Sequence, residues 1–299
     1  MKGGTRHFVE LPGVTLSVRE WGDPARPKLV LVPGTGLPSE LFLGVEARLG
    51  SEWHGYSFDR RGQGQSTTPE TGWDFADFAN DLHLAMRALG LDEAVGLGHS
   101  AGGTDMLLAA AMDHAPFTRL VIMEPTLQDP RTPPLNETRP PTWERSARRA
   151  RQRRIEYPAV DDIVERWKVA PNFQRAEPDL LQAYIEAAFE PTAAGTFRLR
   201  CLPEVERTMV RPIMQVFERR YRPPDGQPDP FRPLLSLQTP VTLTTSEHSG
   251  GYYAEMVQRG LSMLPNARHV HLEGVGHLVP LEQPDALVGL VNRPTRAQT

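Results

Sequence analysis

Short, wholly apolar segments alternate with amphipathic segments along most of this chain. Leu29-Val30-Leu31-Val32 ends at Pro33-Gly34, and similar apolar runs occupy residues 94–98 and 120–123. A strand that is apolar at every position is typical of a strand buried on both faces. Between these runs, residues 75–89 carry apolar side chains at helical spacing. Buried strands that alternate with helices predict a mainly parallel sheet with helices on both faces.

The same rhythm returns near the C-terminus after a long break. The alternation of strands and helices stops from about residue 126 to residue 234. In this stretch, turns interrupt helix-like pieces and no buried strand is expected. Residues 124–234 hold 17 of the 29 prolines, and proline breaks helices into short pieces. We therefore predict an α/β core, residues 1–125 and 235–299, with a helical cap at 126–234 inserted after the sixth strand. The expected helices are 143–154, 160–167 and 179–189 in the break and 252–263 and 278–291 after it; the later strands are 241–245 and 267–272.

Composition narrows the class of protein. The chain of 299 residues is 39% hydrophobic and has a formal net charge of −4, which gives no reason to expect a nucleic-acid partner. No apolar run is long enough for a membrane span, and the first residues lack the apolar segment of a signal peptide. A single cysteine, Cys201, excludes an intrachain disulfide. We expect a soluble, cytoplasmic protein with a small-molecule partner; its oligomeric state is left open.

Gly98-His99-Ser100-Ala101-Gly102 fits the pattern G-x-S-x-G and lies between an expected strand and an expected helix. In that context the serine occupies a tight, strained turn that lifts its hydroxyl above the edge of the sheet. The glycines two residues before and after it leave room for strand and helix to pass closely. The helix N-terminus also directs unpaired N–H groups toward a developing oxyanion. The pattern predicts that Ser100 is a nucleophile.

A nucleophilic serine needs a general base, and His277 is the candidate. It follows Gly274-Val275-Gly276 just past the last expected strand, so it lies at the same carboxyl edge of the sheet as Ser100. His269 and His271 alternate within that strand, and together with His277 they could suggest a metal site. No cluster of acidic ligands accompanies them, so we expect no metal.

Together these motifs resemble the α/β-hydrolase fold family over nearly the whole chain. Pro33-Gly34-Thr35-Gly36 looks like the oxyanion loop after the family's third strand, although Pro33 stands where histidine is common. The segment 59–66 looks like the loop after the fourth strand. The resemblance implies an eight-stranded, mostly parallel sheet with a cap inserted after strand 6. It also implies that the backbone N–H groups of Thr35 and Ala101 form the oxyanion hole and that no cofactor is needed.

The acid of the expected triad departs from the family's commonest pattern. Family members usually carry aspartate in the loop after the seventh strand, where this chain has Ser249 within Ser246-Glu247-His248-Ser249. A second known placement is the end of the sixth strand, where this chain has Glu124. Zearalenone-lactonase-like hydrolases and one branch of the haloalkane dehalogenases use that placement. We predict Glu124 as the acid and keep Glu247 as the alternative.

The triad and the resemblance imply a serine hydrolase that cleaves an apolar carboxylic ester or a lactone through an acyl-enzyme. Haloalkane dehalogenation is disfavoured because it needs a carboxylate where Ser100 stands. Carbon–carbon bond hydrolysis, cofactor-free peroxidation and a ligand-binding receptor of the same fold remain alternatives. The insertion would cover Ser100, and its large apolar side chains could line a pocket or merely hold the cap together. These side chains are Trp143, Trp167, Phe173, Tyr184, Phe189 and Phe197.

Overall fold

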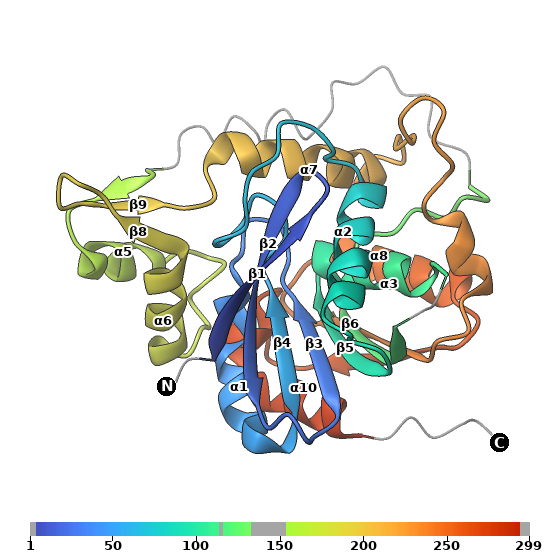
Figure 1. Cartoon of the computed structure of the whole chain (residues 1–299), viewed down its shortest axis with the longest axis horizontal. Helices are drawn as coiled ribbons and strands as arrows, with labels where there is room; N and C mark the ends of the chain where they lie inside the picture. Colours follow the sequence, from blue (N-terminus) through green and yellow to red (C-terminus); the bar gives the residue numbers. More distant parts are fainter. Residues whose placement is uncertain (1–3, 114–115, 133–153, 294–299) are drawn as a thin grey trace.

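An eight-stranded sheet forms the centre of the molecule (Figure 1). The computed structural model describes residues 4–113, 116–132 and 154–293. β1 pairs antiparallel with β2, and β2 with β4, whereas all other neighbouring strands are parallel. This is the mostly parallel sheet that the sequence predicts. In spatial order the strands are β1 (Thr5–Leu11), β2 (Val14–Gly22), β4 (His54–Phe58), β3 (Lys28–Val32), β5 (Ala94–His99), β6 (Phe117–Met123), β10 (Val241–Ser246) and β11 (Ala267–Leu272).

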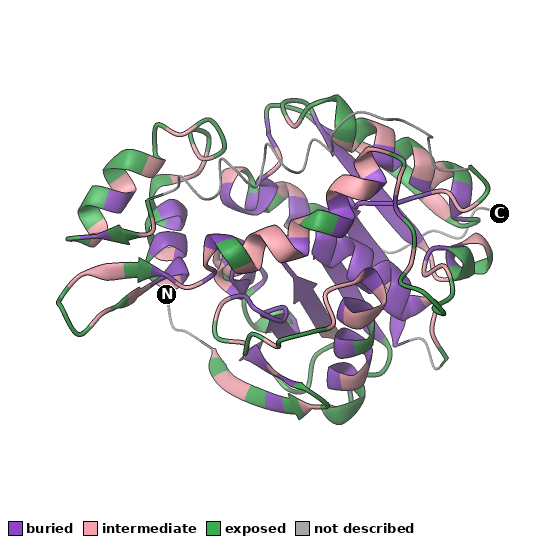
Figure 2. Ribbon diagram, turned by 90° about the horizontal axis from the view of Figure 1, so that it is seen from above, coloured by how far each residue is buried: buried purple, intermediate pink, exposed green. Residues whose placement is uncertain are grey.

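The apolar strands are buried because helices cover both faces of the sheet. Along β3, Val30 and Val32 belong to one hydrophobic core while Leu29 and Leu31 belong to the other, since successive side chains of a strand point to opposite faces. Figure 2 shows the buried strands at the centre and the exposed positions on the outer sides of the helices. The first core includes side chains of α2 (Phe75–Ala88), α3 (Ala101–Ala110) and α8 (Gly251–Met263); the second includes those of α1 (Leu43–Leu49), α9 (Val279–Glu282) and α10 (Pro284–Asn292). Two 3-10 turns, η1 (Ser39–Phe42) and η2 (Gly50–Glu52), flank α1.

The segment between β6 and β10 contains helices, as the sequence predicts, and also a small sheet that the sequence did not indicate. Three short strands pair antiparallel in the order β7-β9-β8. Each has only two or three residues, too few to show a strand period in the sequence. The described elements are β7 (Glu156–Tyr157), α5 (Val160–Trp167), α6 (Pro178–Ala188), β8 (Phe189–Pro191), β9 (Phe197–Leu199), α7 (Pro203–Phe217) and η3 (Arg232–Ser236).

Two of the expected helices of this segment, 160–167 and 179–189, correspond to α5 and α6. The third, 143–154, lies outside the described residues except for its last position. α7 was not expected, and it lies over the edge where the parallel strands end (Figure 1). The division into a core and a cap at 126–234 stays a prediction.

The single helix expected at 278–291 is two helices, α9 and α10. The break falls at Gln283, whose backbone is not helical (φ −153°, ψ 66°). Pro284 follows, and the proline ring disfavours the helical conformation of the residue before it. Among the described residues, no helix is long and apolar enough to cross a bilayer.

Candidate active site

Ser100 occupies a strained turn between β5 and α3. Its φ of 52° and ψ of −125° lie outside the regions that side chains ordinarily allow. Its N–H donates to the carbonyl of Met123 at the end of β6 (2.7 Å), so the neighbouring strand fixes the turn. The hydroxyl therefore stands at the carboxyl edge of the sheet, as the G-x-S-x-G pattern predicts.

Gly98 and Gly102 allow the elements around this turn to approach closely. A Cβ atom at Gly98 would lie 2.5 Å from the Cα of Gly103, and one at Gly102 would lie 2.3 Å from the carbonyl oxygen of Pro33. Both obstacles are backbone atoms, which cannot rotate away as a side chain can. The prediction that these two positions must lack side chains is confirmed.

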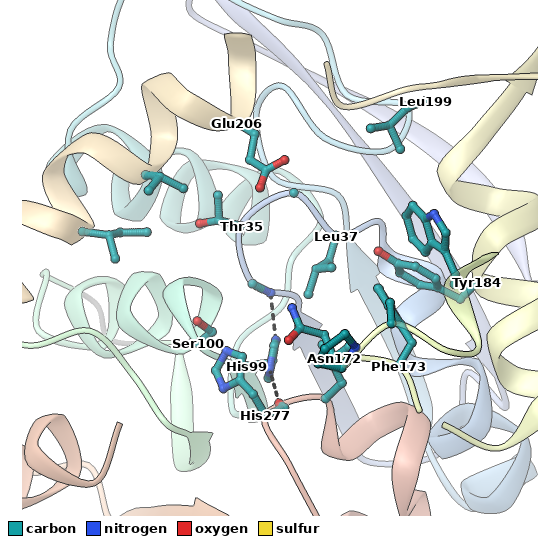
Figure 3. Close-up of a pocket in the computed structure, with 18 of the residues that line it drawn as sticks. Thr35, Leu37, His99, Ser100, Asn172, Phe173, Tyr184, Leu199, Glu206 and His277 are labelled. Carbon is teal, nitrogen blue, oxygen red and sulfur yellow. Dashed lines mark hydrogen bonds between the residues drawn. The ribbon is translucent and has the colours of Figure 1, made fainter. Parts of the chain in front are cut away.

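His277 follows β11 and meets Glu124, which follows β6. The Nδ1 atom of His277 lies 2.6 Å from Oε2 of Glu124, and Glu124 is only 1% exposed. An ionised carboxylate accepts the Nδ1–H, which leaves Nε2 free to accept a proton. The imidazole of His277 lies beside Ser100 (Figure 3). The three residues that the sequence predicts as a triad thus come together at one edge of the sheet.

The second oxygen of Glu124 is also held. Oε1 accepts hydrogen bonds from the N–H of Ser246 (2.8 Å) and from the hydroxyl of Ser249. Ser249 stands where the family usually carries its aspartate, and its hydroxyl donates to the carboxylate of Glu124. Glu124 itself has a φ of 47°, a strained angle that these hydrogen bonds help to hold.

Glu247, the alternative acid, points elsewhere. Its Oε2 accepts the N–H of Gly274 (2.7 Å), and this bond, with His248 nearby, lowers the pKa of Glu247. Its side chain is about half exposed, at 49%. Within the described part of the chain it has no recorded contact with His277.

The buried side chain of Gln63 makes three hydrogen bonds to the backbone of the loop 34–37, which follows β3. Its Oε1 accepts the N–H of Gly36 (3.0 Å), and its Nε2 donates to the carbonyls of Gly34 (3.0 Å) and Leu37 (2.8 Å). Arg60 donates to Gln63 and to the hydroxyl of Thr35. The segment 59–66 therefore acts as the scaffold of the expected oxyanion loop. Among the described residues, the N–H groups of Thr35 and Ala101 have no acceptor within the protein, and Thr35 lines the cavity beside Ser100.

His99 connects this loop to the loop of His277, and sequence reasoning gave it no role. Its Nδ1 accepts the N–H of Gly34 (3.2 Å), and its Nε2 donates to the carbonyl of His277 (2.8 Å). The side chain is fully buried. Burial, reinforced by the nearby His277, lowers the pKa of His99 well below its usual value. His99 is therefore neutral and carries its proton on Nε2.

Tyr253 of α8 covers one face of the His277 imidazole. The two rings stack with their centroids 3.9 Å apart and their planes at 18°. Burial, and then the charge of Glu124, raise the pKa of Tyr253 to about 12, so the phenol stays neutral at ordinary pH. The sequence offered no signal for this contact, because Tyr253 is one of several apolar residues on an amphipathic helix.

Ser100 and His277 open into a cavity of about 780 Å³ between the sheet edge and the inserted segment. Of the large apolar side chains expected in the insertion, Trp167, Phe173 and Tyr184 line it, whereas Phe189 and Phe197 do not. Trp143 lies outside the described residues. Figure 3 shows the lining side chains around Ser100. Three charged side chains also line the cavity: Arg154, Arg166 and Glu206.

A sequence model of the alpha/beta hydrolase family matches residues 29–290 of this chain. The chain belongs to the alpha/beta hydrolase family. Among solved structures, this alpha/beta hydrolase resembles E-2-(acetamidomethylene)succinate hydrolase, with a TM-score of 0.75 and 20% identity over 96% of this chain and 97% of that one. It also resembles an N-formylmaleamic acid deformylase from Pseudomonas putida, with a TM-score of 0.68 and 18% identity over 96% of this chain and all of that one. At these identities the likeness shows the fold.

Curated relatives of the alpha/beta hydrolase match shorter stretches. 2-(Acetamidomethylene)succinate hydrolase of Mesorhizobium japonicum is 34% identical over 103 residues, which are 34% of this chain and 36% of that protein. N-formylmaleamate deformylase of Pseudomonas putida is 36% identical over 103 residues, 34% of this chain and 38% of that protein. The matched stretch thus spans little more than a third of either relative.

His269 and His271 of the alpha/beta hydrolase lie on β11 and share one partner, the hydroxyl of Thr245, at 2.8 and 2.9 Å. His277 instead bonds to Glu124, so the three histidines do not converge. Across the described ranges, no group of three or more histidine, cysteine, aspartate or glutamate side chains is arranged to hold a metal ion.

Proposed function

We propose that this alpha/beta hydrolase is a serine hydrolase that cleaves a carboxylic ester or a lactone through an acyl-enzyme. The observation that carries the proposal is the contact between Glu124 and His277 (2.6 Å) beside Ser100 on its strained turn. A buried carboxylate that holds Nδ1 of an imidazole next to a serine is the arrangement that activates a weak nucleophile.

The proposed reaction has two halves. His277 takes the hydroxyl proton at Nε2 while Oγ of Ser100 bonds to the substrate carbonyl carbon. The carbonyl oxygen of the substrate becomes negative and accepts hydrogen bonds from the backbone N–H groups of Thr35 and Ala101. His277 then gives the proton to the leaving alcohol as the carbon–oxygen bond breaks. Water, activated by the same imidazole, releases the acid from Ser100, and Glu124 holds the histidine throughout.

We include amides in the substrate class to be tested. One curated relative is named as a hydrolase of 2-(acetamidomethylene)succinate and another as a deformylase of N-formylmaleamate. Both names indicate an acyl group on nitrogen, and the same attack by a serine on a carbonyl cleaves esters and amides. Other relatives are named non-heme chloroperoxidases, which keeps cofactor-free peroxidation as the second candidate.

We also propose that residues 126–234 act as a cap that shapes the pocket and excludes water from it. Support comes from the cavity, since most of its lining side chains belong to α5, α6, α7 and the segments that join them.

The test is covalent labelling of the intact protein. A fluorophosphonate probe should phosphonylate the wild-type enzyme with loss of fluoride and leave Ser100→Ala unlabelled, and the labelled peptide should contain Ser100. p-Nitrophenyl esters should give a burst of nitrophenolate in proportion to enzyme, after which a panel of esters, lactones and amides ranks substrates. Absence of any labelling or burst, with tight binding of a small molecule retained, would overturn the proposal in favour of a receptor.

A further inference from the structure

The cavity beside Ser100 has two chemically different ends. Near α7 it is lined mainly by aliphatic side chains, Val210, Ile213 and Met214, together with Phe217. Near α5 and α6 it is lined by the rings of Trp167, Phe173 and Tyr184, together with the polar side chains of Arg166 and Asn172. In the close-up the side chains of Phe173 and Tyr184 lie on the far side of Leu37 and Asn172 from Ser100 (Figure 3). The aromatic end is therefore set apart from the reacting serine, where it can contact only a remote part of a substrate.

We call the three side chains Trp167, Phe173 and Tyr184 the aromatic cluster. Trp167 and Phe173 stack with centroids 4.8 Å apart at 27°, and Tyr184 lies 5.7 Å from Phe173 and 6.2 Å from Trp167. Behind them, the buried ring of Phe189 meets Trp167 edge-on at 5.4 Å. The cluster is thus fixed by packing before any ligand arrives, so little side-chain freedom is lost on binding.

A neighbouring ring of the same cavity already has a cationic partner. Tyr157 lies under the guanidinium of Arg154, whose central carbon is 4.6 Å from the ring centroid. Its face is occupied by that cation–π contact. Aromatic pairs prefer offset or edge-to-face contacts with centroids about 4.5–7 Å apart, and the aromatic cluster already uses such contacts within itself. A cavity of about 780 Å³ is large enough for a substrate that reaches both Ser100 and the cluster.

We propose that the aromatic cluster is a binding subsite for an aromatic group of the substrate, remote from the bond that is cleaved. The inference rests on the proposed function and adds to it a substrate class: esters, lactones or amides that carry an aryl ring on either the acyl or the leaving side. An aliphatic group of equal size would bury similar area there but lose the ring-to-ring contacts.

The test compares pairs of esters that differ only in saturation of one ring. Ethyl phenylpropanoate and ethyl cyclohexylpropanoate place the ring on the acyl side, and benzyl acetate and cyclohexylmethyl acetate place it on the leaving side. In at least one pair, kcat/KM of the wild type should favour the aromatic member about three- to tenfold. The cyclohexyl member is the more hydrophobic of each pair, so burial alone would reverse this order.

Two variants and a matched control locate the preference. Phe173→Leu and Trp167→Leu should each bring the ratio of kcat/KM values to about one or below. Phe217→Leu makes the same replacement at the opposite end of the cavity and should leave the ratio at its wild-type value. Two results overturn the subsite: a saturated ester hydrolysed as fast as the aromatic one in both pairs, or a ratio that falls in Phe217→Leu and survives in both other variants.

Binding of ketones separates this inference from the proposed function. Benzylacetone and its cyclohexyl analogue cannot be hydrolysed, and calorimetry gives their Kd values on wild-type protein and on Phe173→Leu. An aromatic preference that Phe173→Leu removes supports the subsite even if no ester is turned over. Equal affinity of the two ketones, in a protein that hydrolyses esters, would leave the proposed reaction standing and reject the subsite.

Discussion

The hydrogen bonds of the Glu124 carboxylate help to hold this residue in an unfavourable backbone conformation. Its φ of 47° is uncommon for a residue with a side chain, and both carboxylate oxygens have partners, His277 on one and Ser246 with Ser249 on the other. Strain that persists in a buried site is characteristic of functional positions. The strained backbone of Glu124 places its carboxylate against the imidazole of His277.

Replacement of Glu124 by glutamine should lower kcat by about 10²–10⁴-fold with the fold intact, because a neutral amide neither selects the Nδ1–H tautomer nor stabilises imidazolium. Glu247→Gln is the matched control, since Glu247 bonds to Gly274 on the surface. Steady-state kinetics and circular dichroism of both variants check this. Near-normal turnover of Glu124→Gln, with loss of turnover in Glu247→Gln, would reverse the assignment of the acid.

Tyr253 should matter through its ring and not through its hydroxyl. Tyr253→Phe keeps the face that stacks on His277 at 3.9 Å, so its kcat should stay within about twofold of wild type. Tyr253→Leu frees the imidazole to rotate and should lower kcat by roughly tenfold or more while KM changes little. A loss confined to KM, or equal losses in the two variants, would show that Tyr253 contacts substrate and does not orient His277.

The sequence was informative for side chains whose role follows from chain position. Ser100, His277 and Glu124 each follow a predicted strand, and in a parallel sheet the ends of these strands converge. His99, Tyr253 and Ser249 were not assigned a supporting role, because their partners depend on which way a side chain turns. Nothing in the local pattern distinguishes a tyrosine that stacks on an imidazole from one that packs in a core.

At the scale of elements, the loop 34–37 depends on Gln63 for its shape. Gln63→Ala removes the three hydrogen bonds from Gln63 to this loop and leaves those from His99 and Arg60, so the N–H of Thr35 should be held less firmly. We expect kcat to fall by about 10–10²-fold, more than KM changes, since a misplaced donor weakens stabilisation of the oxyanion.

Gln65→Ala is the control for that variant, because Gln65 lies in the same segment with its side chain exposed. It should keep wild-type kinetics. Labelling by a fluorophosphonate provides a second readout, as it also creates a negative oxygen in this site. If Gln63→Ala labels and turns over at the wild-type rate, the loop is held by other contacts.

Long elements were predictable and short ones were not. The central strands β3 and β5 were recognised because burial on both faces makes nearly every position apolar. α5 was recognised because its apolar positions recur at helical spacing. The sequence did not predict β7, β8 and β9, because a strand of two or three residues is too short to show an alternating pattern. Pro284 marks the break between α9 and α10, because proline disfavours a helical conformation at Gln283. The apolar pattern continues across this point and therefore suggested one helix.

At the scale of the whole molecule, the buried His99 should make folding stability depend on pH. The pKa of His99 is lowered in the folded state, whereas an unfolded histidine titrates near about 6.5. Below that pH His99 binds a proton in the unfolded chain but not in the folded chain, so the free energy of unfolding falls as pH falls. The contribution of His99 is pH-independent above about 7 and is lost progressively from about 6.5 downward.

Urea unfolding of wild type and His99→Gln, from pH 7.5 to pH 5, measures this effect by difference. The advantage of the wild type over the variant should be constant above about pH 7 and shrink by up to about 1.4 kcal/mol for each pH unit below 6. Glutamine removes the titrating group and keeps an amide for the neighbouring carbonyl. Parallel stability curves across the whole range would mean that His99 takes up its proton equally in both states.

The hydroxyl of Ser249 on the carboxylate of Glu124 has an evolutionary consequence. β6 and β10 are neighbours, and the residues that follow them, Glu124 and Ser249, touch each other beside one imidazole. Substitutions at positions 124 and 249 alone could therefore move the carboxylate from the end of β6 to the loop after β10, while His277 stays in place.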